Sequence, residues 1–305
     1  MKAVVCTKYG APEVLKIVEI EKPVPKDDEV LIKVMASAVN SADVRVRKLD
    51  ADGMLKIVMR FVLGFSKPRN AVMGTSFSGI VEQTGKNVRR FKIGDEVFGL
   101  MGVKLGAQAE YAVKQEKGMI AIKPVNATFE EAAAIPFGAH TSIYFLESAK
   151  IKEIKSPKVL IYGATGAVGT SAIQIAKHFN AQVAAVCSEA GQGLAKELGA
   201  DDIILYEKED FTKLNEKFDI VFDAVGKTSK KKCGPLLKEN GTYVTVASLD
   251  IAKEKVEQLE LLRDLFEAGN YKAAIDKVFT MESIVDSHRY VDTGRKKGNV
   301  VVTIG

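Results

Sequence analysis

The sequence predicts a two-domain α/β protein in which a β-rich, barrel-like domain is followed by a doubly wound parallel sheet. The first 120 residues hold many short apolar or alternating runs that end at Gly, Asn or Asp, a pattern typical of a compact β domain. From Thr128 onward, short β-branched runs alternate with helical stretches, as in a parallel sheet covered by helices. A chain of 305 residues is long enough for two hydrophobic cores.

In the first domain, each predicted strand is an apolar or alternating run next to a turn signal. The predicted strands lie within residues 30–36, 78–82, 90–99, 111–113 and 119–122. Gly94-Asp95 marks a turn inside the third of these segments. Residues 51–69 fit either a helix or a lid over the cleft between the domains.

In the second domain, helix signals and strand signals alternate. Thr128 and Glu131 have the spacing of a capping box, and we expect Pro136 to end the helix that this box starts. Another helix is predicted over 141–149. Further strands are predicted near 158–162, 182–187, 202–205, 218–222 and 242–246, and further helices near 167–179, 189–198, 228–238 and 254–268. A last strand at 298–304 has no helix after it, and we expect it to return to the first domain.

The most informative segment is a Gly-rich turn between a predicted strand and a predicted helix. Small residues let a pyrophosphate approach the backbone, and the helix N-terminus attracts its charge. Gly166 is the candidate for that approach, and Gly169 for close helix–strand packing, while Ala164 stands where the dinucleotide fingerprint has its first Gly. A P-loop would need a Lys, which residues 169–171 lack; a plain tight turn remains the alternative. The predicted cofactor-binding residues of the turn are Gly163, Ala164, Thr165, Gly166, Ala167, Val168 and Gly169.

The end of the second predicted strand bears on which nicotinamide cofactor binds. An NAD-selective site has a carboxylate there for the ribose hydroxyls, whereas this strand ends at Cys187-Ser188, with Glu189 one or two residues late. No cation follows before Lys196 to pair with a 2′-phosphate. The sequence therefore favours NADPH over NADH only slightly, with Ser188 at the ribose. Glu189 is also an ordinary partner for a helix dipole.

Two loops beyond strand ends should line the nicotinamide side, because ligands bind at the carboxyl ends of parallel strands. The candidates are Asp223, Ala224, Val225, Ala247 and Ser248. Asp223 can equally be a turn or capping residue.

The amino-acid composition limits which kinds of partner the protein can have. The net charge is +5 with dispersed basic residues, and Lys230–Lys232 fits a solvated helix face better than a nucleic-acid patch. The three cysteines are far apart in sequence, which argues against a disulfide framework or a cysteine-rich zinc site. No apolar run approaches the ~20 residues that span a bilayer. We therefore expect a cytoplasmic protein with a small-molecule substrate and without membrane or nucleic-acid partners.

These motifs together resemble the medium-chain dehydrogenase/reductase superfamily, and most of all its zinc-free quinone oxidoreductase-like branch. The likeness lies in residues 1–5, 9–15, 23–34, 94–99, 130–136, 163–169, 198–201 and 223–226. It implies a GroES-like domain over 1–125, a Rossmann domain over 126–270 and a return segment over 271–305. It further implies hydride transfer from NAD(P)H to a quinone, an enone or another activated carbonyl or alkene.

The resemblance also implies site residues and argues against zinc. Zinc-dependent members carry a Cys early in the chain and a His-Glu pair in a Gly-rich turn, where this chain has residues 39–43 and Thr75-Ser76. Hydroxyls are poor zinc ligands, so we expect no metal. Asn40 and Asp43 match positions near nicotinamide or substrate, and Thr141 matches one near the cofactor. A turn-forming role is the alternative for Asn40.

Two further questions stay open. A chain that binds NADPH with little catalysis would be a redox sensor or interaction protein instead of an enzyme. The stretch from 246 to 262 is shorter than in relatives, so a sixth sheet strand is shortened or lost. Many relatives dimerise through that edge, which puts a homodimer in doubt.

Overall fold

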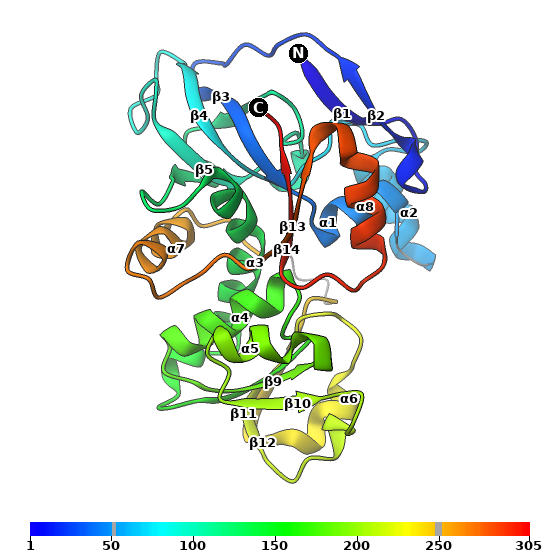
Figure 1. Cartoon of the computed structure of the whole chain (residues 1–305), viewed down its shortest axis with the longest axis vertical. Helices are drawn as coiled ribbons and strands as arrows, with labels where there is room; N and C mark the ends of the chain where they lie inside the picture. Colours follow the sequence, from blue (N-terminus) through cyan, green and yellow to red (C-terminus); the bar gives the residue numbers. More distant parts are fainter. Residues whose placement is uncertain (51–52, 248–251) are drawn as a thin grey trace. The chain divides into compact units, whose positions relative to one another are not determined.

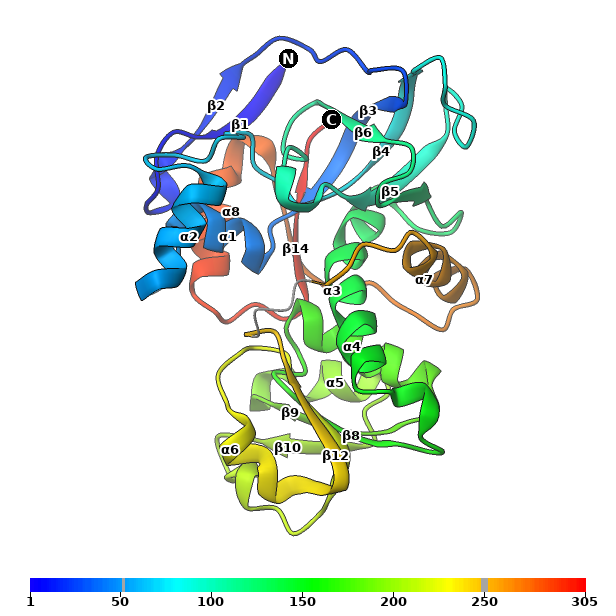
Figure 2. The same cartoon turned by 180° about the vertical axis from the view of Figure 1, so that it is seen from behind.

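The computed structural model describes residues 1–50, 53–247 and 252–305. The chain forms two compact units, each built from more than one segment. Unit 1 comprises Met1–Pro136, Lys255–Glu267 and Ile275–Gly305. Unit 2 comprises Phe137–Glu254 and Ala268–Ala274. Figures 1 and 2 show the helices and strands of both units.

Unit 1 is built on a seven-stranded sheet, as the many short apolar runs predicted. Its order is β13 (Ile275–Thr280), β14 (Asn299–Thr303), β3 (Glu29–Ala38), β4 (Ser76–Thr84), β5 (Glu96–Leu100) and β7 (Ile120–Ile122), with β6 (Tyr111–Gln115) also paired to β3. β3 is the centre of the sheet, because β4, β6 and β14 all pair with it. β1 (Lys2–Cys6) and β2 (Leu15–Glu19) form a separate antiparallel pair.

Among the described residues, the α-helices that lie wholly in unit 1 are α1 (Ser41–Lys48), α2 (Gly53–Leu63), α7 (Glu257–Glu267) and α8 (Ile284–Asp292). α2 falls in the segment that the sequence left open between a helix and a lid. α8 packs against α1 (Figures 1 and 2). The fully buried guanidinium of Arg47 on α1 donates hydrogen bonds to both carboxylate oxygens of Asp292 on α8, at 2.8 and 2.7 Å.

Unit 2 is built on a parallel five-stranded sheet. Its order is β10 (Asp202–Leu205), β9 (Gln182–Cys187), β8 (Lys158–Tyr162), β11 (Phe218–Asp223) and β12 (Leu237–Thr245). The strand order reverses at β8, which lies between β9 and β11. Ligands bind at such switch points in doubly wound folds. Among the described residues, β12 is an edge of the sheet, with no sixth strand beside it.

Four α-helices belong wholly or partly to unit 2: α3 (Phe129–Ser148), α4 (Ala167–His178), α5 (Gln192–Glu197) and α6 (Lys230–Cys233). The prediction that Pro136 ends a helix was wrong, because α3 continues through it. A proline costs one backbone hydrogen bond and adds a clash, but the neighbouring Ala132–Ile135, Ala139 and Ile143 are all buried. Their burial holds the helix together across the proline.

The last part of unit 2 differs most from the sequence prediction. The helix expected over 228–238 ends at Cys233, and β12 begins already at Leu237. Gly234-Pro235 explains the early end, since both residues disfavour a continued helix. Short 3₁₀ helices complete the chain at Pro12–Val14, Gly102–Lys104, Ile151–Glu153, Glu189–Gly191, Phe211–Lys213, Gly234–Leu236 and Met281–Ser283. No helix of the described residues has the length and apolar character to cross a bilayer.

Candidate functional site

The Gly-rich turn joins β8 to α4 at the switch point of the unit 2 sheet. Gly163 adopts a φ of +78°, which favours glycine. The backbone N–H groups of Gly163 and Ala164 donate to the Val186 carbonyl of the neighbouring strand, at 3.0 and 3.1 Å. Gly166 is the N-cap of α4. The turn is therefore held to β9, and Gly166 stands directly before the helix.

The three glycines of the turn differ in the space around them. A Cβ on Gly166 would meet only the Gly163 carbonyl oxygen, at 3.6 Å. A Cβ on Gly169 would lie 2.1 Å from that oxygen, and one on Gly163 would lie 1.8 Å from a methyl carbon of Val225. Open space thus exists only at Gly166, while Gly163 and Gly169 are closely packed.

The first turn of α4 has unused hydrogen-bond donors. The first N–H that bonds within the helix belongs to Thr170, which donates to the Gly166 carbonyl at 2.9 Å. The N–H groups of Ala167, Val168 and Gly169 precede it and have no acceptor within the helix. Free N–H groups beside the open space at Gly166 fit a phosphate group. The residues present therefore fit a dinucleotide.

Thr141 does not present a free hydroxyl proton here. Its hydroxyl donates to the Phe137 carbonyl within α3, at 2.8 Å. Other residues of α3 support the Gly-rich turn. The Ser142 hydroxyl donates to the Val168 carbonyl at 2.9 Å, and a Cβ on Gly138 would lie 2.3 Å from the Ala167 carbonyl oxygen.

An unpartnered hydroxyl follows the end of β9. Beside the next residue, Glu189, lies a cation from another loop, Lys208, which the sequence analysis did not predict. The Ser188 hydroxyl oxygen is buried without a hydrogen-bond partner. Lys208, in the loop after β10, pairs with Glu189 at 2.8 Å, and this ion pair lowers the pKa of Glu189. The Glu207 carboxylate accepts the N–H of Glu189 at 2.6 Å. Sequence reasoning could have found Lys208, because β9 and β10 are parallel neighbours and the loops after them therefore lie at the same edge of the sheet.

The Asp223 carboxylate organises the loop after β11. It is fully buried and accepts backbone N–H groups from Val225, Gly226 and Thr228, at 3.1, 2.8 and 2.9 Å. It also accepts the hydroxyl of Tyr243 at 3.2 Å. Asp223 thus holds the following Ala224-Val225 loop in shape, as its turn-residue alternative expected.

Of the other loop residues, Ala247 packs beside the same loop. A Cβ on Gly226 would lie 2.9 Å from the Ala247 Cβ. Ser248 lies outside the described residues.

A second polar cluster lies in unit 1, where Asn40 precedes α1. Asn40 and Asp43 occupy the N-cap and N3 positions of a capping box. Asp43 Oδ2 accepts the Asn40 backbone N–H at 2.8 Å and the Thr75 hydroxyl at 3.1 Å. The Asn40 side-chain amide donates to the Thr75 hydroxyl oxygen at 2.8 Å and to the Ser76 hydroxyl oxygen at 3.3 Å.

Burial dominates the electrostatics of this cluster. Asp43 is fully buried, and desolvation raises its pKa to about 7, although hydrogen bonds from Asn40 and Thr75 act in the opposite direction. Its second oxygen, Oδ1, has no hydrogen-bond partner. The structure therefore brings Asn40 and Asp43 together and adds Thr75 and Ser76 to them.

Comparisons with known proteins agree with this geometry. Residues 26–124 match the family model described as the alcohol dehydrogenase GroES-like domain, and residues 198–302 match the zinc-binding dehydrogenase model. The 2-methylene-furan-3-one reductase of Solanum lycopersicum is 38% identical over 99% of this chain and 79% of its own length. The chain belongs to the medium-chain dehydrogenase/reductase superfamily.

Other members of the superfamily show the same likeness along the whole chain. The chloroplastic NADPH-dependent alkenal/one oxidoreductase of Arabidopsis thaliana is 33% identical over 99% of this chain and 79% of its own length. The solved structure of the quinone oxidoreductase from Coxiella burnetii has a TM-score of 0.89 and 28% identity, covering 100% of this chain and 99% of that one. The α/β fold with a GroES-like domain is that of the superfamily.

The zinc named in one matching model does not fit the donors of this chain. At the places where the resemblance puts the ligands of zinc-dependent members, residues 39–43 and Thr75-Ser76 offer hydroxyls, the Asn40 amide and a single carboxylate, that of Asp43. A tight zinc site needs thiolate, imidazole or carboxylate ligands. In the part of the chain that the structure describes, no group of three or more His, Cys, Asp or Glu residues could hold a metal ion. We therefore derive no step through a metal.

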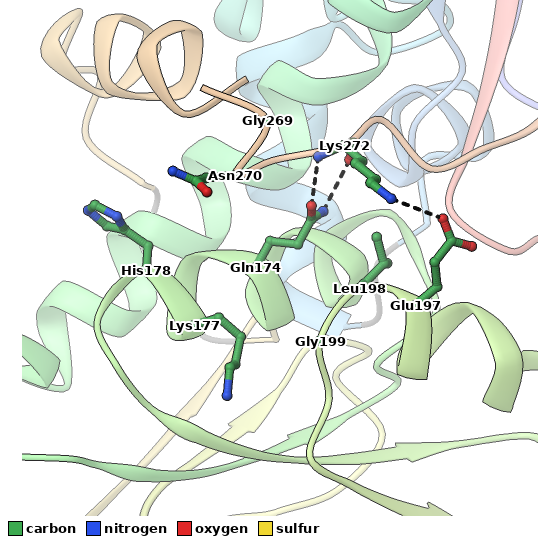
Figure 3. Close-up of a pocket in the computed structure, with 9 residues that line it drawn as sticks. All are labelled: Gln174, Lys177, His178, Glu197, Leu198, Gly199, Gly269, Asn270 and Lys272. Carbon is green, nitrogen blue, oxygen red and sulfur yellow. Dashed lines mark hydrogen bonds and ion pairs between the residues drawn. The ribbon is translucent and has the colours of Figure 1, made fainter. Parts of the chain in front are cut away.

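A cavity of about 450 Å³ in unit 2 is lined by Gln174, Lys177 and His178 of α4, by Glu197–Gly199, and by Gly269, Asn270 and Lys272 (Figure 3). It is at the C-terminal end of α4, a helix of 12 residues and so about 18 Å long. Gln174 exchanges two hydrogen bonds with the backbone of Lys272, at 3.1 and 2.7 Å. The two lysines that line the cavity form ion pairs, Lys177 with Asp201 and Lys272 with Glu197. This cavity is separate from the dinucleotide site.

Proposed function

We propose that this protein is an NAD(P)H-dependent oxidoreductase that transfers hydride to a quinone, an enone or another activated carbonyl or alkene, without zinc. The observation that carries the proposal is the open first turn of α4 at Gly166, with free N–H groups beside it. It lies at the switch point of a parallel sheet, in a chain whose relatives are named as reductases of enones, alkenals and quinones.

In this proposal each part of the chain has a defined task. The N–H groups of Ala167, Val168 and Gly169 bind the pyrophosphate, with Gly163, Ala164, Thr165 and Gly166 shaping the space. Ser188 binds the ribose, and Thr141 lies near the cofactor. The loops at Asp223–Val225 and Ala247 line the nicotinamide side of the site. The cofactor supplies the hydride when it is bound.

The unit 1 cluster would serve the substrate. Developing negative charge on a substrate oxygen needs hydrogen-bond donors when no metal is present. Both N–H bonds of the Asn40 amide are directed at Thr75 and Ser76. Asn40 is therefore better placed to orient these two hydroxyls than to donate directly.

We propose NADPH as the preferred cofactor. Lys208 brings to the end of β9 the cation that a 2′-phosphate needs, although Glu189 pairs with it in this structure. The name of the Arabidopsis relative includes NADPH. A cytoplasmic location and a small-molecule substrate complete the proposal; some relatives are named as chloroplastic or mitochondrial.

The test combines binding with turnover. Calorimetric titration with NADPH and NADH measures the two affinities, and a panel of quinones, enones and aldehydes measures oxidation of the cofactor at 340 nm. We expect tighter binding of NADPH and turnover of at least one acceptor class. Binding without turnover on any acceptor would favour a redox sensor instead. No heat with either cofactor would exclude both functions.

A further inference from the structure

Asp43 has one hydrogen-bonded route for a proton to reach a less buried group. Its carboxyl group contacts one hydroxyl, that of Thr75, and its other donors are backbone N–H groups such as that of Asn40. A backbone amide does not pass protons at neutral pH, whereas a hydroxyl can give one proton while it accepts another. Thr75 is 6% exposed and Asp43 is 0% exposed. Thr75 is therefore the group through which Asp43 could exchange a proton.

The Asn40 amide fixes this route. It donates to the oxygen of the Thr75 hydroxyl at 2.8 Å, on the same atom that contacts Asp43 at 3.1 Å. The amide also reaches Ser76, which is fully buried. The Thr75 oxygen is thus oriented by one donor and one carboxyl group.

Several charged and titratable groups lie on α1 and on the elements packed against it. Arg47 is bound by Asp292 and by the Gly10 carbonyl, and Lys48 also pairs with Asp292. Burial lowers the pKa of His288 on α8 to about 3, so its ring is neutral. Burial also raises the pKa of the Cys6 thiol on β1 to about 11. The pKa of Asp43, which burial raises to about 7, lies between those of His288 and Cys6.

We propose that Asp43 is the proton source for reduction of an alkene conjugated to a carbonyl, acting through the Thr75 hydroxyl. The inference rests on the proposed function. Hydride addition to the β-carbon leaves an enolate, whose α-carbon takes the proton of the Thr75 hydroxyl. Thr75 takes the proton of Asp43 as its own O–H bond breaks. Asp43 is left as a carboxylate and regains a proton from water.

The first test measures the proton on Asp43 in the protein without cofactor. Infrared difference spectra between pH 5 and 9 should show a protonated carboxyl band that disappears near pH 7 and is absent from Asp43→Asn. A band that is lost by pH 5 would overturn the proposal. This measurement needs no turnover, and thermal melting of Asp43→Asn shows that the compared variant is folded.

The second test separates proton supply from hydride transfer. A hydroquinone monoanion needs no proton from the protein, whereas an enolate does, so the ratio of enone to quinone kcat reports the relay. We expect Thr75→Val to lower this ratio about 100-fold, within the range of general acid catalysis, and Thr75→Ser to restore it. In the wild type, enone kcat should fall above pH 7, and Thr75→Val should remove that pH dependence.

The outcomes are distinguishable. An enone-to-quinone ratio that Thr75→Val leaves within about twofold of the wild type overturns the relay alone, because turnover itself is intact. Absence of enone turnover in the wild type, with NADPH bound, overturns the proposed function and the relay with it. Thermal melting of each variant separates loss of the relay from loss of the fold.

Discussion

Gly169 lies against Gly163 so closely that a Cβ on the former would come within 2.1 Å of the carbonyl oxygen of the latter. Real Cβ atoms do not approach a backbone oxygen to that distance. The start of α4 is therefore packed directly on the end of β8, with no room for a side chain. Three residues earlier in the same turn, Gly166 leaves open space. Close packing and open space are thus separated onto two glycines.

This separation predicts different effects for two matched substitutions. Gly166→Ala should keep the melting temperature, because φ is −80° there and the nearest atom is 3.6 Å away. Its methyl group should nevertheless weaken NADPH binding about tenfold or more by displacing the phosphate. Gly169→Ala should lower stability by about 1–3 kcal/mol through overpacking. Calorimetry and urea unfolding of both variants check this, and a destabilised Gly166→Ala would contradict it.

The Glu189–Lys208 ion pair should control the choice of cofactor. Glu189→Gln frees the Lys208 ammonium for a 2′-phosphate, so we expect NADPH to bind more tightly, by about fivefold at most for an exposed pair. Lys208→Ala should weaken NADPH binding by a similar factor. NADH has no 2′-phosphate and serves as the control ligand, whose affinity should change less in both variants. Equal effects on the two cofactors would refute a role at the ribose.

Asp43 should make folding stability fall as pH rises through the slightly acidic range. Its folded pKa of about 7 is above the ordinary 3.8, so between these values the folded state holds a proton that the unfolded state releases. The contribution changes by up to about 1.4 kcal/mol per pH unit. Asp43→Asn removes it, so the variant should gain stability relative to the wild type from pH 5 to 7. Urea unfolding at several pH values measures this difference.

His288 acts with the opposite sign in an overlapping range. Its folded pKa of about 3 is below the ordinary 6.5, so its contribution is lost as the pH falls from about 6.5 towards 3. Because both the wild type and Asp43→Asn contain His288, their difference cancels its effect. A flat difference between pH 5 and 7 would show that Asp43 is ionised throughout.

Removal of Arg47 should strongly destabilise unit 1. Its buried guanidinium binds Asp292 and the Gly10 carbonyl, and breaking a buried pair from one side costs about 3–5 kcal/mol. Lys48 also contacts Asp292, at 3.0 Å, so Arg47→Met should fall at the low end of that range. Lys86→Met, which breaks an exposed pair with Asp27, is the control and should cost less than about 1 kcal/mol. Equal losses in the two variants would contradict the argument.

Chelation should leave the enzyme active. The donors at Asn40, Thr75 and Ser76 are an amide and two hydroxyls, which hold zinc weakly. We expect EDTA to change neither NADPH oxidation nor the melting temperature, and elemental analysis of purified protein to find less than stoichiometric zinc. Loss of activity with chelator that returns with zinc would show that another donor set is present.

The sequence predicted the elements whose signals are local. Strands at 158–162, 182–187 and 202–205 were placed correctly from short β-branched runs, and the start of α4 from the Gly-rich turn. The pairing of Arg47 with Asp292 could not be predicted, because a single sequence gives no signal that links two residues 245 positions apart. The helix through Pro136 was also missed, because tertiary burial outweighed a local breaker.

The candidate site also has features that local sequence predicted and features that it did not. The Gly-rich turn has a spacing that can be recognised, and residues 166 and 169 have the environments that their spacing suggested. The position of Lys208 beside Glu189 depends on which strands are neighbours in the sheet. The hydrogen bond from Thr75 to Asp43 depends on the course of the chain between them. Such contacts follow from topology and not from spacing.

The place of β14 in the unit 1 sheet has a consequence for biosynthesis. β14 pairs with β3 on one side and β13 on the other, yet the ribosome makes it only after all of unit 2. Until then, residues 36–38 of β3 lack the strand that pairs with them, while all of unit 2 has already been synthesised. Nascent chains of this protein should therefore complete the five-stranded sheet of unit 2 before the seven-stranded sheet of unit 1.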